Sequence, residues 1–302
     1  MRVEVETINA FTKNDQGGNP AGVVLGLEGK TFSSKQMQSI AREVNLSETA
    51  FVLPFEKKKG SADADYCVRF FTINSEVGLC GHATIAAWTD LYQKGIINPG
   101  EYTQQIQAGI LRVDILTDGR IIMDQPRPVF KKEFAAGDIA SVLDVPIEWV
   151  DNTNLTPRVV STGLNDLMIP IDTREHLFAI NINDARISNF EEKYGLDSFH
   201  MFTLDTVDPS STANSRNADP FHGIHEESAT GSAHGALACY LFQYGIVTAE
   251  QAMNGLAFEQ GYNLQSPSEI FTRLDIKNNE IGRVQVGGHA SFKGSKELEI
   301  EN

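Results

Sequence analysis

Apolar and polar residues alternate along the beginning of the chain in a way that is typical of short β-strands. The alternation covers residues 3–11, and a Gly-Gly-Asn-Pro turn signal at 17–20 separates it from an apolar run at 21–27. Residues 50–55 and 66–73 have the same strand character. These patterns predict a β-rich first part of the chain with short connections.

Two segments have helical patterns instead. Ser33 and Gln36 form a capping-box pattern, which marks the start of a helix. The apolar residues that follow fall on one face of a helix of about three turns: Met37, Ile40, Ala41 and Val44. Residues 84–94 are mostly apolar on all sides, so we predict a buried helix there.

One stretch of the chain recurs 150 residues later without a gap. Residues 76–96 align with 226–246, and eight of the 21 aligned positions are identical, where average amino-acid usage predicts about one or two. The identical pairs are Glu76/Glu226, Gly81/Gly231, Ala83/Ala233, Ala86/Ala236, Leu91/Leu241, Gln93/Gln243, Gly95/Gly245 and Ile96/Ile246. We interpret this recurrence as an internal duplication of roughly half the chain.

Each copy has the same layout, with an acidic residue, a turn of small residues, a largely apolar helix and a glycine. Gly95 and Gly245 stand where helices commonly end on a left-handed glycine. A helix that is apolar all around must be enclosed, so each half is expected to wrap strands around its own central helix. We expect the linker between the halves within 124–138, which has two prolines and a run of charges.

The acidic composition limits the kinds of partner. With 40 Asp and Glu against 25 Lys and Arg, the 302-residue chain has a net charge of −15. We expect no nucleic-acid partner and no membrane partner, because both surfaces need clustered Lys and Arg. A small anionic substrate can still bind at local backbone dipoles.

The apolar runs and the cysteines indicate the cellular compartment of the protein. No apolar run approaches the roughly 20 residues that span a bilayer, and the N-terminus lacks the apolar core of a signal peptide. The three cysteines, Cys67, Cys80 and Cys239, are odd in number and far apart, which is no disulfide framework. We therefore expect a soluble, cytoplasmic protein.

The duplicated turns are the first candidates for chemistry. Helix N-termini expose unpaired N–H groups and the positive end of the helix dipole, and Gly81 and Gly231 let a ligand approach the backbone. Two such termini could hold a carboxylate if the halves pack about a pseudo-twofold axis. The alternative is that both glycines only allow tight packing between helix and strand.

Short motifs occur in a fixed order along nearly the whole chain. They are Gly18-Asn19-Pro20-Ala21, Asn45-Leu46-Ser47-Glu48-Thr49-Ala50-Phe51, Glu76-Val77-x-Leu79-Cys80-Gly81-His82-Ala83-Thr84, Ser161-Thr162-Gly163, Ala229-Thr230-Gly231-Ser232-Ala233-His234-Gly235, Glu259-Gln260-Gly261 and Val286-Gly287-Gly288. As an ordered set they resemble the phenazine-biosynthesis isomerase (PhzF-like) family, within the diaminopimelate epimerase-like fold. Each motif by itself is weak.

The resemblance implies an α+β fold of two pseudo-symmetric lobes. Each lobe would be a mixed, β-barrel-like sheet wrapped around a central α-helix, with the site between the lobes. We expect an N-terminal lobe at 1–127 and a C-terminal lobe at 128–302, and leave open that the last strand returns to the first lobe. A homodimer is expected from the family alone.

The resemblance also implies proton transfer without a cofactor or a metal. In the family pattern Glu48 is the general acid/base, although a Glu between a helix and a strand is most often a solvated loop residue. Burial in a closed cleft is expected to raise the pKa of Glu48 toward neutrality. His82 would contact the substrate, and the nearby positive helix end favours its neutral form. A packing histidine is the alternative.

The second turn departs from the family pattern. The family commonly has Asp-Pro before this turn, whereas this chain has Glu227-Ser228. Glu227 keeps the carboxylate on a longer side chain, and we expect it to be catalytic together with Glu48 and His82. Glu226 could substitute, but its repeat partner Glu76 indicates a structural role. Ser232 is expected to bind substrate, to cap the helix, or both. The expected substrate-binding residues are Asn19, Gly81, Thr230, Gly231 and Ser232.

Three other interpretations compete with an isomerase. An amino-acid epimerase or racemase would need two bases, and the repeat partner of Cys80 is Thr230. Metal-dependent hydrolysis could use His222 and His225, but the glycine between them favours a turn. A non-enzymatic binding module on the same scaffold is the third. We predict an isomerase that moves a proton on a small carboxylic acid, with the substrate itself left open.

Overall fold

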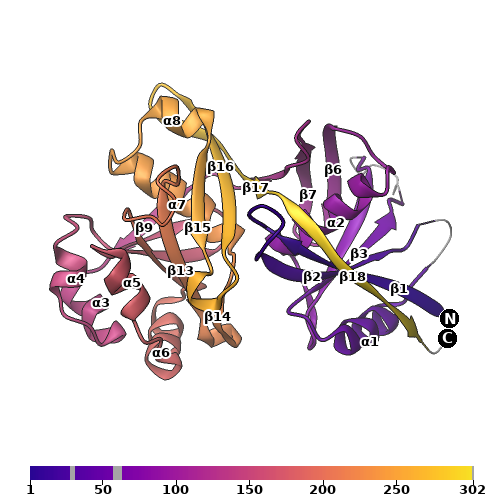
Figure 1. Cartoon of the computed structure of the whole chain (residues 1–302), viewed down its shortest axis with the longest axis horizontal. Helices are drawn as coiled ribbons and strands as arrows, with labels where there is room; N and C mark the ends of the chain where they lie inside the picture. The colour runs from indigo at the N-terminus through magenta and orange to yellow at the C-terminus, as the bar shows by residue number, and fades with distance from the viewer. Residues whose placement is uncertain (28–30, 57–62, 301–302) are drawn as a thin grey trace. The chain divides into compact units, whose positions relative to one another are not determined.

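The strands and helices predicted for the first part of the chain are present in the structure, a computed structural model that describes residues 1–27, 31–56 and 63–300 (Figure 1). The fold is mixed α/β, and its strands are hydrogen-bonded into one large mixed sheet. The chain divides into two compact units, Met1–Asp124 with Gly287–Asn302, and Gln125–Val286. The boundary predicted at 127/128 lies close to this division, and a pseudo-twofold relation between the units stays a prediction.

The first unit contains most strands of the N-terminal part and the last strand of the chain. Its strands are β1 Arg2–Ala10, β2 Asn19–Leu25, β3 Thr49–Pro54, β4 Tyr66–Phe71, β5 Glu76–Val77, β6 Gly100–Ile106, β7 Gly109–Ile115, β8 Ile121–Gln125 and β18 Ala290–Glu299, and its helices are α1 Ser34–Val44 and α2 Gly81–Gln93. β1 pairs antiparallel with β2 and with β18. This pairing brings the two ends of the chain together, where the Met1 amino group donates to Ile300 O at 2.7 Å (Figure 1).

The second unit contains the remaining elements. Its strands are β9 Val129–Glu133, β10 Arg158–Ser161, β11 Asn165–Pro170, β12 Ser198–Thr203, β13 Ala213–Asp219, β14 Ile224–Glu227, β15 Leu256–Gln260, β16 Ser268–Lys277 and β17 Glu280–Gly288, and its helices are α3 Ala136–Leu143, α4 Glu148–Asp151, α5 Arg174–Ala179, α6 Asp184–Tyr194, α7 Gly231–Gln243, α8 Ala249–Asn254 and the 3₁₀ turns η1 Pro220–His222 and η2 Tyr262–Leu264. The division between the units at Asp124/Gln125 lies within the predicted linker range 124–138, but that range is not all loop, because β9 within it pairs antiparallel with β10.

Strand pairing follows the same order in both units. In the first unit β2 is parallel to β3, β3 antiparallel to β4, and β4 parallel to β6. In the second unit β11 is parallel to β12, β12 antiparallel to β13, and β13 parallel to β15. The two buried helices occupy the same place in this order, α2 between β5 and β6 and α7 between β14 and β15.

The buried helices α2 and α7 begin and end in the same way. In α2 every residue from His82 to Leu91 is buried, which confirms the predicted buried helix up to Leu91, whereas Gln93 and Lys94 at its end are exposed. The helix packs against β1, β2, β3 and β18, so strands enclose it. Gly95 and Gly245 follow the two helices with φ of 68° and 71°, which a glycine adopts without strain. The N–H groups of Ile96 and Ile246 then donate to the carbonyls five residues earlier, which closes each helix end.

Helix α1 forms where its capping box predicts. Ser33 Oγ accepts from the N–H of Gln36, and the Gln36 side chain accepts from the N–H of Ser33. Met37, Ile40 and Ala41 are buried against β3 and β4 in the core of the first unit. Asn45 ends the helix in the left-handed conformation (φ 57°) and turns the chain toward β3.

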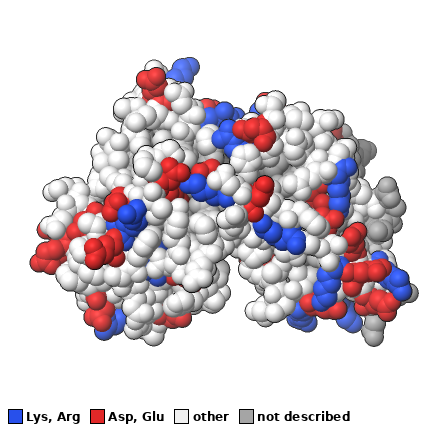
Figure 2. All heavy atoms as spheres, in the orientation of Figure 1, with Lys and Arg blue, Asp and Glu red and all other residues white. Residues whose placement is uncertain are grey.

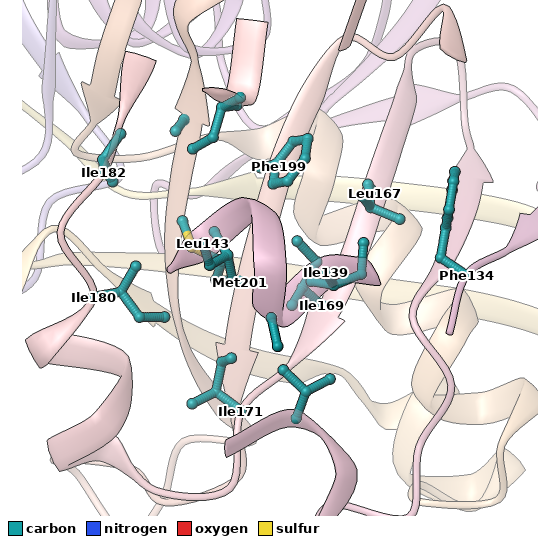
Figure 3. Close-up of a cluster of buried hydrophobic side chains, with 14 of the residues drawn as sticks. Phe134, Ile139, Leu143, Leu167, Ile169, Ile171, Ile180, Ile182, Phe199 and Met201 are labelled. Carbon is teal, nitrogen blue, oxygen red and sulfur yellow. The ribbon is translucent and has the colours of Figure 1, made fainter. Parts of the chain in front are cut away.

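The second unit has a larger apolar core of its own. Helices α3 to α6 contribute to it together with strands β10 to β13, and Figure 3 shows several of its side chains meeting from these elements. Its fully buried members include Ile139, Leu167, Ile169, Leu177, Ile187, Phe199 and Met201. This core belongs to the second unit alone.

The described surface agrees with the acidic composition. On the face shown in Figure 2, acidic and basic side chains are interspersed, and the described residues form no broad basic area there. Among the described residues, no helix is long and apolar enough to cross a membrane.

Candidate active site

Glu48 and His82 form a buried ion pair in the first unit. Glu48 lies in the short loop between α1 and β3, where its carbonyl accepts from the N–H of Gly22. His82 is the second residue of α2, and its Nε2 lies 3.0 Å from Glu48 Oε2. The side chains are only 6% and 15% exposed. The hydroxyl of Ser47 lies 3.3 Å from the same Nε2, so two adjacent residues of the loop contact one ring nitrogen.

This ion pair changes the expected charge of both residues. Burial alone would raise the pKa of Glu48, but the His82 charge and hydrogen bonds from His82 and Ser47 lower that pKa below its usual 4.5. Burial would lower the pKa of His82, but Cys80 and the Glu48 carboxylate raise it well above 6.5. The expectations of a raised Glu48 pKa and a neutral His82 were therefore wrong, because each residue stabilises the charged form of the other.

Cys80 completes a cluster with this pair. It is the N-cap residue of α2, and its Sγ lies 3.6 Å from Nδ1 and 3.9 Å from Nε2 of His82. Burial, and then the Glu48 charge, raise the pKa of the Cys80 thiol. The sequence indicated a small buried cysteine, and it is buried, but it also borders the Glu48–His82 pair.

Gly81 leaves the start of α2 open. A Cβ built on Gly81 would have no described atom within 4 Å beyond its two chain neighbours and the nearby backbone of its own helix. Tight packing therefore does not explain this glycine, and a ligand could approach the backbone N–H groups here. Asn19, another expected binding residue, is the buried first residue of β2, opposite Ala10 of β1.

The turn of the second unit holds Glu227 against the start of α7. Thr230 is the N-cap residue, and its hydroxyl donates to Glu227 Oε2 at 2.5 Å. The amide of the buried Gln260 donates to the Glu227 carbonyl and to the Thr230 hydroxyl, and its Oε1 accepts from the N–H of Thr230. Three expected site residues of the second unit, Glu227, Thr230 and Gly231, thus lie together at the start of one helix.

Ser232 does not cap α7. The N-cap residue is Thr230, and Ser232 is the second residue of the helix, so the expectation of a capping role was wrong. The Ser232 carbonyl accepts from Gln125 Nε2 and Thr162 Oγ1. Its role in binding substrate stays a prediction.

The N-cap carbonyls of both buried helices are held from within the helix. Thr84 Oγ1 donates to the Cys80 carbonyl at 2.8 Å, and His234 Nδ1 lies 2.8 Å from the Thr230 carbonyl. His234 Nε2 lies 2.8 Å from Ser215 Oγ. Thr84 and His234 are 150 residues apart, so they occupy equivalent positions of the repeat. The repeat could therefore have identified these equivalent contacts to the N-cap carbonyls, which the sequence reasoning missed.

Glu76 and Glu226 are engaged by arginines. Arg69 donates through Nε and a terminal nitrogen to both carboxylate oxygens of Glu76, and Arg216 does the same to Glu226. Both glutamates therefore link neighbouring strands, which supports the structural role that the repeat indicated.

The two histidines considered for metal-dependent hydrolysis, His222 and His225, each contact an aspartate. His222 Nδ1 contacts Asp219 at 2.8 Å, and His225 Nδ1 contacts Asp184 at 2.6 Å. Among the described residues, neither belongs to a group of three metal-ligating side chains.

Comparisons with known proteins identify the class. The family model described as phenazine biosynthesis-like protein (PhzC-PhzF) matches residues 8–294. The chain therefore belongs to this family of isomerases, and the resemblance found in the sequence is confirmed. The uncharacterized isomerase YfhB of Bacillus subtilis is 34% identical over 307 aligned residues, which cover 98% of this chain and 99% of that protein.

Solved structures agree with this assignment. A phenazine biosynthesis protein of the PhzF family from Bacillus anthracis has a TM-score of 0.85 at 25% identity, covering 99% of this chain and 100% of that chain. A hydroxyproline epimerase from Agrobacterium vitis has a TM-score of 0.57 at 11% identity, covering 98% and 92%. At that identity the epimerase shows a shared fold only.

Proposed function

We propose that this chain is a cofactor-independent isomerase that moves a proton on a small carboxylic acid, with Glu48 as the general acid/base. The observation that carries the proposal is the buried contact of 3.0 Å between Glu48 and His82 beside the open start of α2. A carboxylate held in a low-dielectric place next to a possible anion site is suited to acid–base work on a bound carboxylic acid.

The ion pair supports one starting protonation state for the proposed base. With its pKa lowered, Glu48 is an anion in the resting enzyme and begins as the base. It takes a proton from a carbon of the substrate, and the electron pair of that C–H bond moves into the adjacent conjugated system. Glu48 then returns the proton to another carbon of the same system, so the double bond moves and no atom is gained or lost. His82 orients the carboxylate through both steps.

The substrate carboxylate is proposed to bind at the start of α2. The first N–H groups of a helix have no partner within the helix, and the positive end of its dipole attracts an anion. Gly81 leaves this backbone open, since no described side chain other than those of its chain neighbours would lie within 4 Å of a Cβ there. We also propose that Glu227, Thr230, Gly231 and Ser232 take part in the same reaction, with Thr230 and Gln260 orienting the Glu227 carboxylate.

The alternatives from the sequence have less support. A binding module without activity is disfavoured by membership of an isomerase family. An epimerase with two thiols is disfavoured because Thr230 occupies the place that is equivalent to Cys80. A cytoplasmic location and a homodimer stay predictions.

Hydrogen exchange in deuterium oxide tests the proposal. Small cyclic, amino and unsaturated carboxylic acids would be incubated with wild-type protein and with Glu48→Gln, and deuterium at carbon would be followed by NMR. We expect the wild type to exchange at least one compound, and Glu48→Gln to be slower by about 10²–10⁴-fold, because the proton acceptor is lost.

Glu43→Gln is the matched control for this experiment. Glu43 lies on the exposed side of α1, five residues before Glu48, and its substitution should leave exchange unchanged. Exchange in Glu48→Gln at the wild-type rate would rule out Glu48 as the acid/base.

A further inference from the structure

Three different metal-ligating side chains meet in the first unit. They are the carboxylate of Glu48, the thiol of Cys80 and the imidazole of His82, and one donor atom of each lies within 4.8 Å of the other two. Within the part of the chain that the structure describes, no other group of three or more such side chains is this close.

The distances suit a small tetrahedral ion. His82 Nε2 is close to both other ligand atoms: it lies 3.0 Å from Glu48 Oε2 and 3.9 Å from Cys80 Sγ. Bonds of about 2.0–2.3 Å to Zn²⁺ place the ligand atoms of a tetrahedral site about 3.3–3.6 Å apart. Both distances to His82 Nε2 lie within a few tenths of an ångström of these values, and all three donor atoms lie within 4.8 Å of one another.

The donor set and its surroundings also favour such an ion. A thiolate, an imidazole and a carboxylate are the ligands that Zn²⁺ takes in proteins, and three of them leave one position open. Cys80 and His82 are 8% and 6% exposed, so an ion here would be largely shielded from water. Cys80 caps α2, and because burial and the Glu48 charge raise the pKa of its thiol, an ion that binds here must displace the thiol proton.

The second unit offers a comparison within the same chain. Thr230 and Ser232 stand at the places equivalent to Cys80 and His82. Their hydroxyl groups are poor ligands for Zn²⁺ beside a thiolate and an imidazole. The expected stoichiometry is therefore one ion per chain.

We propose that Glu48, Cys80 and His82 bind one thiophilic divalent transition-metal ion, Zn²⁺ above all, and that this ion inhibits the enzyme. The ion takes the carboxylate that the isomerase needs as its base, so metal binding and proton transfer exclude each other. Metal binding itself does not depend on the proposed function and goes beyond it. The proton transfer uses no metal.

Titration with Co²⁺ tests the site by a spectroscopic readout. Metal-free, full-length protein is titrated with Co²⁺, whose bond to a thiolate gives a charge-transfer band in the near ultraviolet. We expect the band to saturate at one Co²⁺ per chain and to disappear when Zn²⁺ displaces it. Cys80→Ser should lose the band and weaken Zn²⁺ binding by about tenfold or more, since the loss of even an outer-shell group costs that much.

Matched variants separate this site from adventitious binding. Cys67→Ser removes the partly exposed thiol of the same unit, and His225→Gln removes an exposed imidazole, so both should keep the band and its stoichiometry. Glu48→Gln keeps the thiol, so it should retain a band at weaker affinity even if Cys80→Ser folds poorly. Absence of the band in wild type with excess Co²⁺, or its persistence in folded Cys80→Ser, would overturn the metal site.

Zn²⁺ added to the exchange assay tests the inhibition separately. We expect proton exchange by the wild type to fall as the site fills and to return when a chelator removes the ion. Unchanged exchange at full Co²⁺ or Zn²⁺ occupancy would refute the inhibition while leaving the site. Failure of the exchange assay itself would concern the proposed function and not the band.

Discussion

At the scale of single residues, burial and neighbouring charges act in opposite directions, and the neighbour decides the outcome. Glu48 is largely shielded from water but has His82 beside it, so its pKa falls. Asp166 in the second unit is fully buried, and its hydrogen bond from Ser198 is too weak to compensate. Burial first, and then the nearby carboxylates of Asp197 and Asp219, raise its pKa to about 7. Glu48 and Asp166 therefore change the pH dependence of the free energy of unfolding in opposite directions.

Asp166→Asn should change how stability depends on pH. The folded state holds a proton on Asp166 up to about pH 7, whereas the unfolded chain releases it near 3.8. Between these values the folded state binds more protons, so stability falls as pH rises, by up to about 1.4 kcal/mol per pH unit. Asparagine keeps an acceptor for Ser198 without a charge. We expect urea unfolding from pH 4 to 8 to show a shallower decline and a more stable variant at pH 8.

Asp151→Asn, at an exposed position of α4, is the control for this measurement. It should follow the wild type at every pH. If Asp166→Asn also follows the wild type, Asp166 is not the group that titrates.

At the scale of elements, α1 is an example of a helix whose ends are encoded locally. Ser33 and Gln36 start it, Asn45 ends it, and the next residues lead directly to Ser47 and Glu48. The position of the proposed base therefore depends on where this helix stops.

Ser33→Ala should destabilise the protein by about 1 kcal/mol, because the Gln36 N–H loses its acceptor at the helix start. Chemical denaturation would measure the change. Lys35→Ala in the same turn makes no cap contact and should have a smaller effect. An equal loss in both variants would show that the capping box contributes nothing specific.

Local patterns predicted those elements, but not the contacts between distant segments. The first four strands, α1, α2 and both glycine ends follow from turn residues, caps and apolar spacing. β9 lies among prolines and charges, and only its pairing with β10 makes it a strand. Gln260 reaches Thr230 because β13 and β15 run parallel, a register that no short sequence window contains.

For the candidate site, too, the sequence predicted the residues but not the contacts between them. Glu48, His82 and the second turn came from motifs of the family, whereas the charges of Glu48 and His82 and the approach of Cys80 depend on side-chain distances. Motifs can identify such residues, but they do not predict which of their side chains are in contact.

At the scale of the whole molecule, each unit has its own core. The residues beneath α1 form one in the first unit, and helices α3 to α6 enclose another in the second. The two tryptophans of the chain are divided between them, Trp88 in α2 and Trp149 in α4. Trp149 stacks on His176 at 4.2 Å between ring centroids, so unfolding of the second unit must change its surroundings. Each unit thus has its own fluorescent reporter.

These reporters lead to a prediction about cooperativity. Because each core lies within one unit, a cavity in the second should destabilise that unit and leave the first unchanged. Leu167→Ala, at a fully buried position of β11, should cost the second unit about 2–5 kcal/mol. In a Trp88→Phe background the Trp149 fluorescence should then change at lower denaturant, whereas in a Trp149→Phe background the Trp88 transition should not move. Leu91→Ala in α2 should do the reverse. Equal shifts of both signals in either variant would mean that the two units unfold as one.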